Sequence, residues 1–415
     1  TVPIAEVAPL LAPPLDPDEV EAEMRVAAAQ VVEGFAPASP PILDAEFVPI
    51  PAAPETSSGI TPFAGSGVSI VSMTMTGNSE AIVGDALRSV VDWVDRVLVV
   101  DTGVSDNTLR IAREIAGEKL VLREFPWRDD FAAARNFALQ AAAELGADWA
   151  VMLDTDERIE LGGADVRAAL AETDATVLHV KHRGGTYGKE RFFRLPARGA
   201  YVGPTHEAFI IAGGGSGTLD GMLFDELGKT TEQYRQKAER DIAILSRHTA
   251  EHPDDPRWHY YLGDSLAGLG RHDEAIAAFR VCASLDGWDE EGAWAMYRAA
   301  ECLLKLERPV EAIEACAAGM AKHAGLAELP WLAGYAAWHA GRPAQAVYWA
   351  RQSIALGHYA GIGASAPRIG FRHPPALWEG PYDVLRFALR ALGDDAGADE
   401  AERSFARAKA ARESS

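Results

Sequence analysis

Between Val68 and about Phe224 the sequence alternates short β-branched runs with longer runs that have apolar residues at helical spacing. This alternation predicts strands over 68–73, 97–100, 120–123 and 149–153, with helices over 81–94, 107–115 and 131–145. Repeated strand–helix–strand units form a mostly parallel sheet with right-handed crossovers. The segment therefore predicts an α/β domain, a Rossmann-like class of fold.

Carboxylates follow two of the predicted strands. Asp154, Asp156 and Glu157 come directly after the apolar run that starts at Trp149, and Asp101 ends an earlier strand. Ligands of parallel sheets bind beyond the carboxyl ends of the strands, and Mg²⁺ or Mn²⁺ prefers such oxygen ligands together with substrate phosphates. An Asp-rich turn would also explain one D-x-D sequence, but two acidic strand ends at one edge favour a binding site.

From about Gln233 to the end, the chain reads as Ala-rich helix with a repeat. The small residues Ala275, Ala312 and Ala346 recur at nearly the 34-residue period of tetratricopeptide repeats, and a looser unit surrounds Leu392 and Ala401. Such solenoids present concave surfaces that bind peptides or proteins. The alternative is that the array forms a homodimer or braces the first domain.

Composition excludes several partners. The net charge of −22 disfavours sequence-independent binding to nucleic acid or anionic membranes, because both require basic surface. The sequence has no apolar run of membrane-spanning length and does not open on a signal peptide. Three cysteines, Cys282, Cys302 and Cys316, lie in helical sequence without zinc spacing. A cytoplasmic protein without a membrane span is expected.

Residues 1–66 differ in composition from the rest. They hold half of the prolines and Arg25 as their single basic residue, a composition that favours extended chain. One helix is predicted over 18–32. We therefore expect three segments: an acidic, Pro-rich arm over 1–66, the α/β domain over 67–230 and the helical repeats over 231–415.

Ordered motifs through the α/β segment resemble those of family 2 glycosyltransferases with a GT-A nucleotide-sugar-binding domain, here followed by tetratricopeptide repeats. The matching residues are Ser69–Met73 with Asn78 and Glu80, Leu87–Val90, Val99–Gly103 with Ser105–Thr108, Phe125–Trp127, Asp129–Phe131, Ala134–Asn136, Leu153–Glu157, Arg191–Arg194 and His206-Glu207. The subgroup with appended repeats includes enzymes similar to the S-glycosyltransferases that modify bacteriocin peptides. The resemblance covers about residues 67–350.

The resemblance implies a UDP-sugar site at the strand ends. Met75 or Thr76, with Asp101 and Thr102, would hold the base and ribose, although many relatives carry an acid where this chain has Thr102. Arg135 stands where the family places an arginine near the uracil. The alternative for Arg135 is a surface pair with a neighbouring acid, Asp129 or Asp130.

The same resemblance implies a bound Mn²⁺ or Mg²⁺. Asp154 would face the ribose and the metal, and Asp156 would be the direct ligand. Relatives often have a His-x-Gly sequence whose histidine completes the metal shell, whereas this chain has Glu226-Leu227-Gly228. Glu226 is either a carboxylate ligand in place of that histidine or an ordinary surface acid.

Inverting transfer requires a base near the acceptor. Glu207 is the first candidate and Asp130 the alternative, with His206 as an orienting partner of the base. If the acceptor is a cysteine thiol, a weaker base suffices because thiols ionise more easily than hydroxyls. Lys189, near the Gly184-Gly185 loop, is expected to be a solvated charge rather than a phosphate ligand.

Three functions remain open. The first is a metal-dependent inverting glycosyltransferase that moves a hexose or N-acetylhexosamine from a UDP-sugar to a Cys, Ser or Thr side chain of a peptide or protein presented by the repeats. The second is transfer to a saccharide or a lipid-linked glycan. The third is a non-catalytic repeat scaffold with a degenerate sugar-nucleotide domain. The presence of Asp101, Arg135, Asp154 and Asp156 at the matching positions favours an enzyme, whereas Glu226 in place of the expected histidine favours the scaffold.

Overall fold

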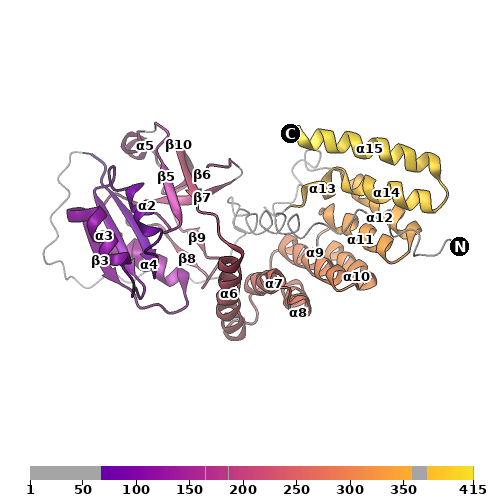
Figure 1. The fold of residues 1–415 in the computed structure, drawn as a ribbon, viewed down its shortest axis with the longest axis horizontal. Coiled ribbons are helices and arrows are strands. Elements are labelled where there is room, and N and C mark those ends of the chain that lie inside the picture. Colours follow the sequence, from indigo (N-terminus) through magenta and orange to yellow (C-terminus); the bar gives the residue numbers. More distant parts are fainter. Residues whose placement is uncertain (1–66, 164, 186, 358–371, 415) are drawn as a thin grey trace. The chain divides into compact units, whose positions relative to one another are not determined.

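The computed structural model describes residues 67–163, 165–185, 187–357 and 372–414. The chain divides into two compact units between His248 and Thr249, and Figure 1 shows the helices and strands of each unit. The arm over 1–66, with the helix predicted at 18–32, lies outside the described residues. Within those residues, no helix combines the length and the apolar character needed to cross a membrane.

The first unit is built on an eight-stranded mixed sheet with the order β3-β2-β1-β4-β7-β6-β10-β5. The strands are β1 (Ile70–Thr76), β2 (Arg96–Asp101), β3 (Leu120–Glu124), β4 (Trp149–Met152), β5 (Glu157–Glu160), β6 (Val177–His182), β7 (Gly188–Arg194) and β10 (Ser216–Glu226). A separate two-stranded sheet pairs β8 (Gly199–Val202) with β9 (Ala208–Ile211).

The sheet is parallel in its first half and largely antiparallel in its second. Strands β3, β2, β1 and β4 are parallel neighbours, as the strand–helix alternation predicts. β7 is antiparallel to both β4 and β6, and β10 is antiparallel to β5. The consecutive strands β6 and β7 have no helix between them, so they pair as a hairpin, which is necessarily antiparallel.

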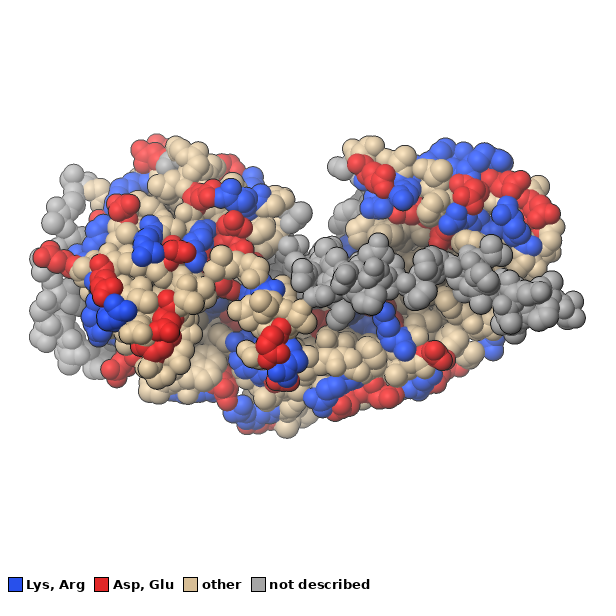
Figure 2. All heavy atoms as spheres, in the orientation of Figure 1, with Lys and Arg blue, Asp and Glu red and all other residues tan. Residues whose placement is uncertain are grey.

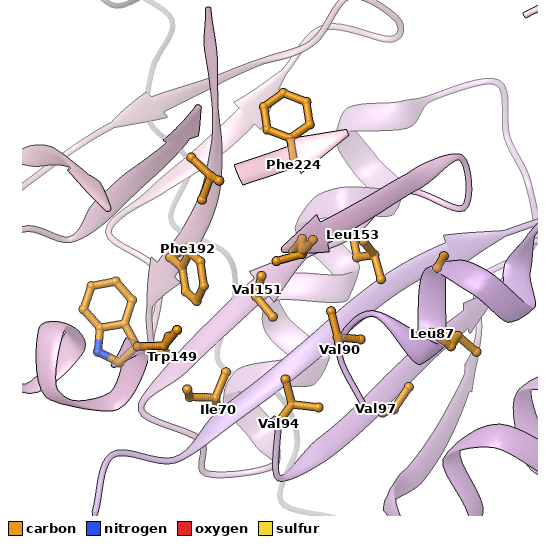
Figure 3. Packing of buried hydrophobic residues seen from close by; sticks show 14 of the residues in the cluster. Ile70, Leu87, Val90, Val94, Val97, Trp149, Val151, Leu153, Phe192 and Phe224 are labelled. Carbon is orange, nitrogen blue, oxygen red and sulfur yellow. The ribbon is translucent and has the colours of Figure 1, made fainter. Parts of the chain in front are cut away.

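Helices cover both faces of the sheet. These are α2 (Val83–Arg88), α3 (Thr108–Ala116), α4 (Phe131–Glu144) and α5 (Val166–Glu172). Alternate strand residues point into two separate cores: Ile70 joins the core with α2, α3 and α5, and Val71 joins the core with α4. Figure 3 shows the first of these cores, where Trp149, Val151 and Phe192 lie beside the residues of α2 and the turn after it.

Helix α2 is shorter than the predicted span of 81–94. It ends at Arg88, and the hydroxyl of Ser89 donates a hydrogen bond of 2.6 Å to the carbonyl of Ala86. A serine that bonds back to the preceding turn and is followed by β-branched valines favours termination of a helix. The following turns still bury Val90 and Val94 in the core.

The remaining helices form a repeat array. α6 (Thr231–Glu251) runs from the first unit into the second and is followed by α7 (Pro256–Gly268), α8 (His272–Ser284), α9 (Asp289–Lys305), α10 (Pro309–Lys322), α11 (Glu328–His339), α12 (Pro343–Leu356), α13 (Pro374–Leu377), α14 (Gly380–Ala391) and α15 (Asp395–Glu413). The repeat-marking residues Ala275, Ala312 and Ala346 are completely buried. Their lack of a long side chain lets the two helices of each hairpin approach closely, which confirms the predicted helical repeats.

Turns between the paired helices share one backbone conformation. Gly270, Gly341 and Gly393 each have a positive φ, between 68° and 80°, just before the second helix of a hairpin. Glu307 takes that position in the hairpin of α9 and α10, with a φ of 57°. A non-glycine residue is strained in this left-handed region.

Candidate functional site

The site lies at the carboxyl edge of the parallel half of the sheet. β1 pairs in parallel with β2 on one side, where Thr76 is opposite Asp101, and with β4 on the other, where Met73 is opposite Met152. Asp101 and Asp154 therefore flank the end of β1 at one edge. This geometry brings the two acidic strand ends together, as their positions in the sequence indicate.

Hydrogen bonds tie the loops after β1 and β2 to each other. Both the backbone N–H and the hydroxyl of Thr102 donate to the carbonyl of Thr76, each at 3.0 Å. One carboxylate oxygen of Asp101 accepts hydrogen bonds from the backbone N–H groups of Gly103 and Val104, at 2.8 and 2.7 Å. Met75 is partly buried and Thr76 is buried at the strand end. The proposed base- and ribose-binding residues thus form one ordered rim.

Arg135 joins the two sides of the site. From α4, its two terminal nitrogens donate to the carboxylate of Asp154 at 3.1 and 3.3 Å, and its Nε donates to Glu207 at 2.6 Å. The ring of Tyr201 lies 5.5 Å from the guanidinium carbon. Arg135 and Glu207 each have side chains only 12% exposed, so this arginine is a buried bridge between the D-x-D sequence and the predicted base.

The alternative surface pairing of Arg135 is not what the structure shows. Asp129 accepts from Trp127 and pairs with Arg247 at 2.9 Å, so its carboxylate is engaged elsewhere. Asp130 is the N-cap of α4 and accepts the N–H of Ala133 at 2.8 Å. This capping bond ties one carboxylate oxygen of Asp130 to the helix start.

His206 is held by helix α6. Its backbone has a φ of 50°, and its Nε2 lies 3.4 Å from the buried carboxylate of Asp241. The hydroxyl of Thr205 and the ammonium of Lys237 also contact Asp241, at 3.3 and 2.6 Å. Burial opposes ionisation of Asp241, but the hydrogen bond from His206 and the charge of Lys237 outweigh it and lower the pKa of Asp241. His206 therefore sits in an anchored loop directly before Glu207.

A second cluster of charges surrounds Glu157, which is completely buried. Its carboxylate accepts the backbone N–H of Asp154 at 3.2 Å and pairs with Arg191 and Lys189 of β7. Arg191 also lies 3.6 Å from Asp154. Burial and the nearby carboxylates raise the pKa of Glu157, whereas the charges of Arg135 and Arg191 overcome burial and lower the pKa of Asp154. Through its hydrogen bond with the N–H of Asp154, Glu157 thus fixes the turn that carries the D-x-D sequence.

Each proposed metal ligand is paired with a lysine. Asp156 contacts the ammonium of Lys229 at 2.7 Å. Glu226 pairs with Lys189 and accepts a 2.9 Å hydrogen bond from the hydroxyl of Tyr187. The two carboxylates belong to adjacent chain segments, because the N–H after Glu226 donates to the carbonyl of Asp156 at 2.8 Å. Glu226 is therefore a structured residue of the site's edge.

The oxygen chemistry of Asp156 and Glu226 suits Mg²⁺ or Mn²⁺. Both side chains are partly exposed, so an ion could reach them. Across the part of the chain that the structure describes, no group of three or more His, Cys, Asp or Glu side chains forms a complete metal shell. Mg²⁺ usually takes one or two protein carboxylates together with substrate phosphates, so Asp156 and Glu226 suit such an ion by the chemistry of their side chains.

Sequence reasoning missed the cations of the site. Lys189 was expected to be solvated, yet its side chain is only 18% exposed and lies between two carboxylates. Arg191, at 5% exposed, was noted only as part of a motif. These residues alternate on β7 and so share one face of the sheet, a pattern that could have indicated their common target. The pairing of Lys229 with Asp156 follows no local pattern.

The visible charge distribution is mixed. Figure 2 shows Lys and Arg side chains interspersed with Asp and Glu side chains over the visible face of each unit. No extended basic area stands out on that face.

The part of the chain that carries the acidic sheet edge matches a known family. Residues 73–217 match the family model "Glycosyl transferase family 2", and the chain therefore contains a glycosyltransferase domain of that family. The matched range includes Asp101, Arg135, Asp154 and Glu207, and it ends before Glu226.

Two curated relatives are similar to this chain over about half of its length. A TPR repeat-containing protein of Synechococcus elongatus is 39% identical over 232 residues, which are 50% of this chain and 54% of that protein. The SPbeta prophage-derived glycosyltransferase SunS of Bacillus subtilis is 23% identical over 225 residues, or 48% of this chain and 49% of that protein. The chain thus spans about half the length of the curated relatives it matches.

Among solved structures, similarity is found to MamA from Desulfovibrio magneticus, with 19% identity and a TM-score of 0.33 over 44% of this chain and 97% of that one. Another MamA structure matches with 14% identity and a TM-score of 0.35 over 46% of this chain and all of that one. TM-scores of this size are too low to establish a common fold.

Proposed function

We propose that the chain is a metal-dependent, inverting glycosyltransferase that moves a hexose or N-acetylhexosamine from a UDP-sugar to a Cys, Ser or Thr side chain of a peptide or protein. The observation that carries this proposal is Arg135, which links Asp154 of the D-x-D sequence to Glu207 within one buried cluster. Similarity to SunS, a glycosyltransferase, and the helical repeats support it.

On the donor side, the rim at the ends of β1 and β2 would hold the nucleotide. Asp101 and Thr102 would face the base and ribose beside Met75 and Thr76, and Asp154 would face the ribose. Asp156 and Glu226 would hold Mn²⁺ or Mg²⁺, which offsets the charge that develops on the diphosphate as the sugar leaves.

On the acceptor side, Glu207 would take the proton. As the acceptor sulfur or oxygen bonds to the anomeric carbon, the bond from that carbon to the diphosphate oxygen breaks, UDP leaves with the electron pair, and the acceptor proton passes to Glu207. Arg135 fixes Glu207 in place, since its Nε donates a hydrogen bond to that carboxylate.

The repeats would present the acceptor. Concave helical-repeat surfaces commonly bind extended peptides, and this array begins within the helix, α6, that also anchors the loop of His206. The peptide or protein acceptor is therefore preferred over a saccharide or lipid-linked glycan.

The test is UDP release by the purified chain with UDP-glucose, UDP-galactose or UDP-N-acetylglucosamine, in Mn²⁺ or Mg²⁺. Peptides with one Cys are compared with matched peptides that carry Ser or Ala there, and mass spectrometry identifies the product. We expect metal-dependent transfer to the Cys or Ser peptide. Glu207→Gln should bind UDP normally but transfer at least about 100-fold more slowly.

Glu232→Gln is the matched control, because Glu232 is an exposed acid of α6 that pairs with Arg235. It should leave transfer unchanged. Absence of both UDP binding and UDP release under every condition would instead support the scaffold hypothesis. Full activity in Glu207→Gln would remove Glu207 as the base and point to Asp130.

A further inference from the structure

Lysine ammonium groups stand at both carboxylates that are proposed to hold the metal, yet the two lysines are fixed to different degrees. Lys189 belongs to β7, contacts Glu157 and Glu226, and lies 5.3 Å from the centre of the Phe224 ring. Two ion pairs, a cation–π contact and the backbone pairing of β7 therefore hold Lys189 in place. Its side chain is 18% exposed.

Lys229 is held much less. It follows β10, in the short connection before α6, and its side chain is 34% exposed. It forms an ion pair at 2.7 Å with Asp156, the second carboxylate of the D-x-D sequence. A lysine is ordinarily an ammonium ion at neutral pH, and the neighbouring carboxylate of Asp156 favours that charged form.

An ammonium at 2.7 Å and a divalent cation cannot both occupy the same carboxylate oxygen, since like charges at such separation repel strongly. A divalent cation that binds Asp156 through this oxygen, Oδ2, therefore displaces Lys229. The anion nearest to a metal-bound Asp156 in a donor complex is the diphosphate, because Mg²⁺ and Mn²⁺ sites of this kind share the cation between carboxylate and phosphate.

We infer that Lys229 is an internal counter-cation of the donor site: it neutralises Asp156 in the free protein and moves to the donor diphosphate when a divalent cation binds Asp156. This inference rests on the proposed function. It assigns to Lys229 the binding of a nucleoside diphosphate, and it makes the metal and the nucleotide bind cooperatively. When the metal binds alone, it displaces Lys229 and the ammonium has no new anion to pair with. When UDP binds as well, its diphosphate becomes that anion, so each ligand strengthens the binding of the other.

The experiment titrates the full chain with Mn²⁺ in the absence and presence of UDP and follows the electron paramagnetic resonance signal of free Mn²⁺. In the native chain, UDP should strengthen Mn²⁺ binding. Lys229→Met removes the competing ammonium, so Mn²⁺ alone should bind roughly fivefold more tightly. The same variant should bind UDP in saturating Mn²⁺ roughly fivefold more weakly, because it lacks the phosphate-binding charge.

Two further variants act as controls. Lys229→Arg keeps the positive charge and should resemble the native chain in both titrations. Lys181→Met removes an ammonium from another ion pair of the same unit, with Asp220, and should change neither affinity. Thermal unfolding of each variant verifies that the chain is folded.

The inference is overturned if Lys229→Met binds Mn²⁺ alone no more tightly than the native chain, or if Lys229→Arg behaves like Lys229→Met. Either result with normal UDP binding leaves the proposed glycosyltransferase function standing. If neither Mn²⁺ nor UDP binds to the native chain or to any variant, the proposed function fails, and this inference fails with it.

Discussion

Arg135 is the residue on which the candidate site depends most. It is nearly buried and pairs with two carboxylates, Asp154 and Glu207, that come from different parts of the fold. Burying three charges is costly unless they are matched. Removal of the arginine would leave both acids in a poorly solvated place. Arg191, 3.6 Å from Asp154, would still offset the charge of that acid, whereas Glu207 would lose the partner described here.

Arg135→Met should lower the free energy of unfolding by about 3 kcal/mol at pH 7, because it breaks a buried charge network. Urea denaturation measures this change. The pKa of Asp154 is lowered in the folded state, where the charges of Arg135 and Arg191 overcome the opposing effect of burial. Its stabilising contribution is therefore present above the ordinary pKa of about 3.9 and is lost as the pH falls below that value.

The difference between the native chain and Arg135→Met should accordingly narrow below about pH 4. Arg235→Met serves as the control, since Arg235 forms exposed pairs with Glu232 and Glu239 on α6, and it should change stability little at any pH. An Arg135→Met chain as stable as the native one at pH 7 would show that the network contributes nothing.

Sequence patterns predicted the candidate site in part. Asp101 and Asp154 could be placed at one edge because parallel strands end together, and the pairing of their strands with β1 agrees with this. The partners of Arg135 could not be predicted, because its contact with Glu207 joins residues 72 positions apart. The same holds for Lys229 and Asp156, 73 positions apart. Such pairs depend on how distant strands and loops pack, and no local periodicity records that.

At the scale of elements, the parallel strands and the helices between them were predictable because each has its own apolar period. The antiparallel half was not. β5, β9 and β10 carry short or irregular runs, and β10 changes register between Thr218 and Leu223. The early end of α2 depends on one serine and its hydrogen bond. Where strand pairing or helix capping determines the bounds of an element, the period of its apolar residues alone does not predict those bounds.

The turn between α9 and α10 offers a prediction at this scale. Glu307 has the positive φ that glycine supplies in three equivalent turns. Glu307→Gly should raise the free energy of unfolding by about 0.5–1 kcal/mol, because relief of left-handed strain exceeds the added entropy of the unfolded chain. Chemical denaturation of the full chain measures the change.

Glu314→Gly is the matched control, since Glu314 is an exposed residue inside α10. It should lower stability by about 1 kcal/mol, the usual effect of glycine in a helix interior. If both substitutions destabilise the chain, the positive φ of Glu307 carries no strain that glycine relieves.

For the whole molecule, the division into two compact units predicts two unfolding transitions in calorimetry. Asp241 belongs to the first unit, has a side chain only 1% exposed and pairs with Lys237 and His206. Asp241→Asn should destabilise that unit by about 2 kcal/mol, less than a fully buried pair would, because Lys237 is partly solvated. Its transition should fall by about 4–8 °C.

The transition of the second unit should remain in place in Asp241→Asn, and Glu307→Gly should shift that second transition alone. The two variants are thus controls for each other. A single transition that moves as a whole in both would show that the continuous helix α6 makes the chain one cooperative unit.

The bridge made by Arg135 has a consequence for the fate of the donor in the proposed transferase. Water is the acceptor that is always present, and a base free to deprotonate it would hydrolyse UDP-sugars without a product. The Nε of Arg135 engages one oxygen of Glu207 at 2.6 Å, and the side chain of Glu207 is only 12% exposed, so little water can approach the oxygen that remains. The idle site would therefore conserve its sugar until an acceptor side chain enters and takes the place of water.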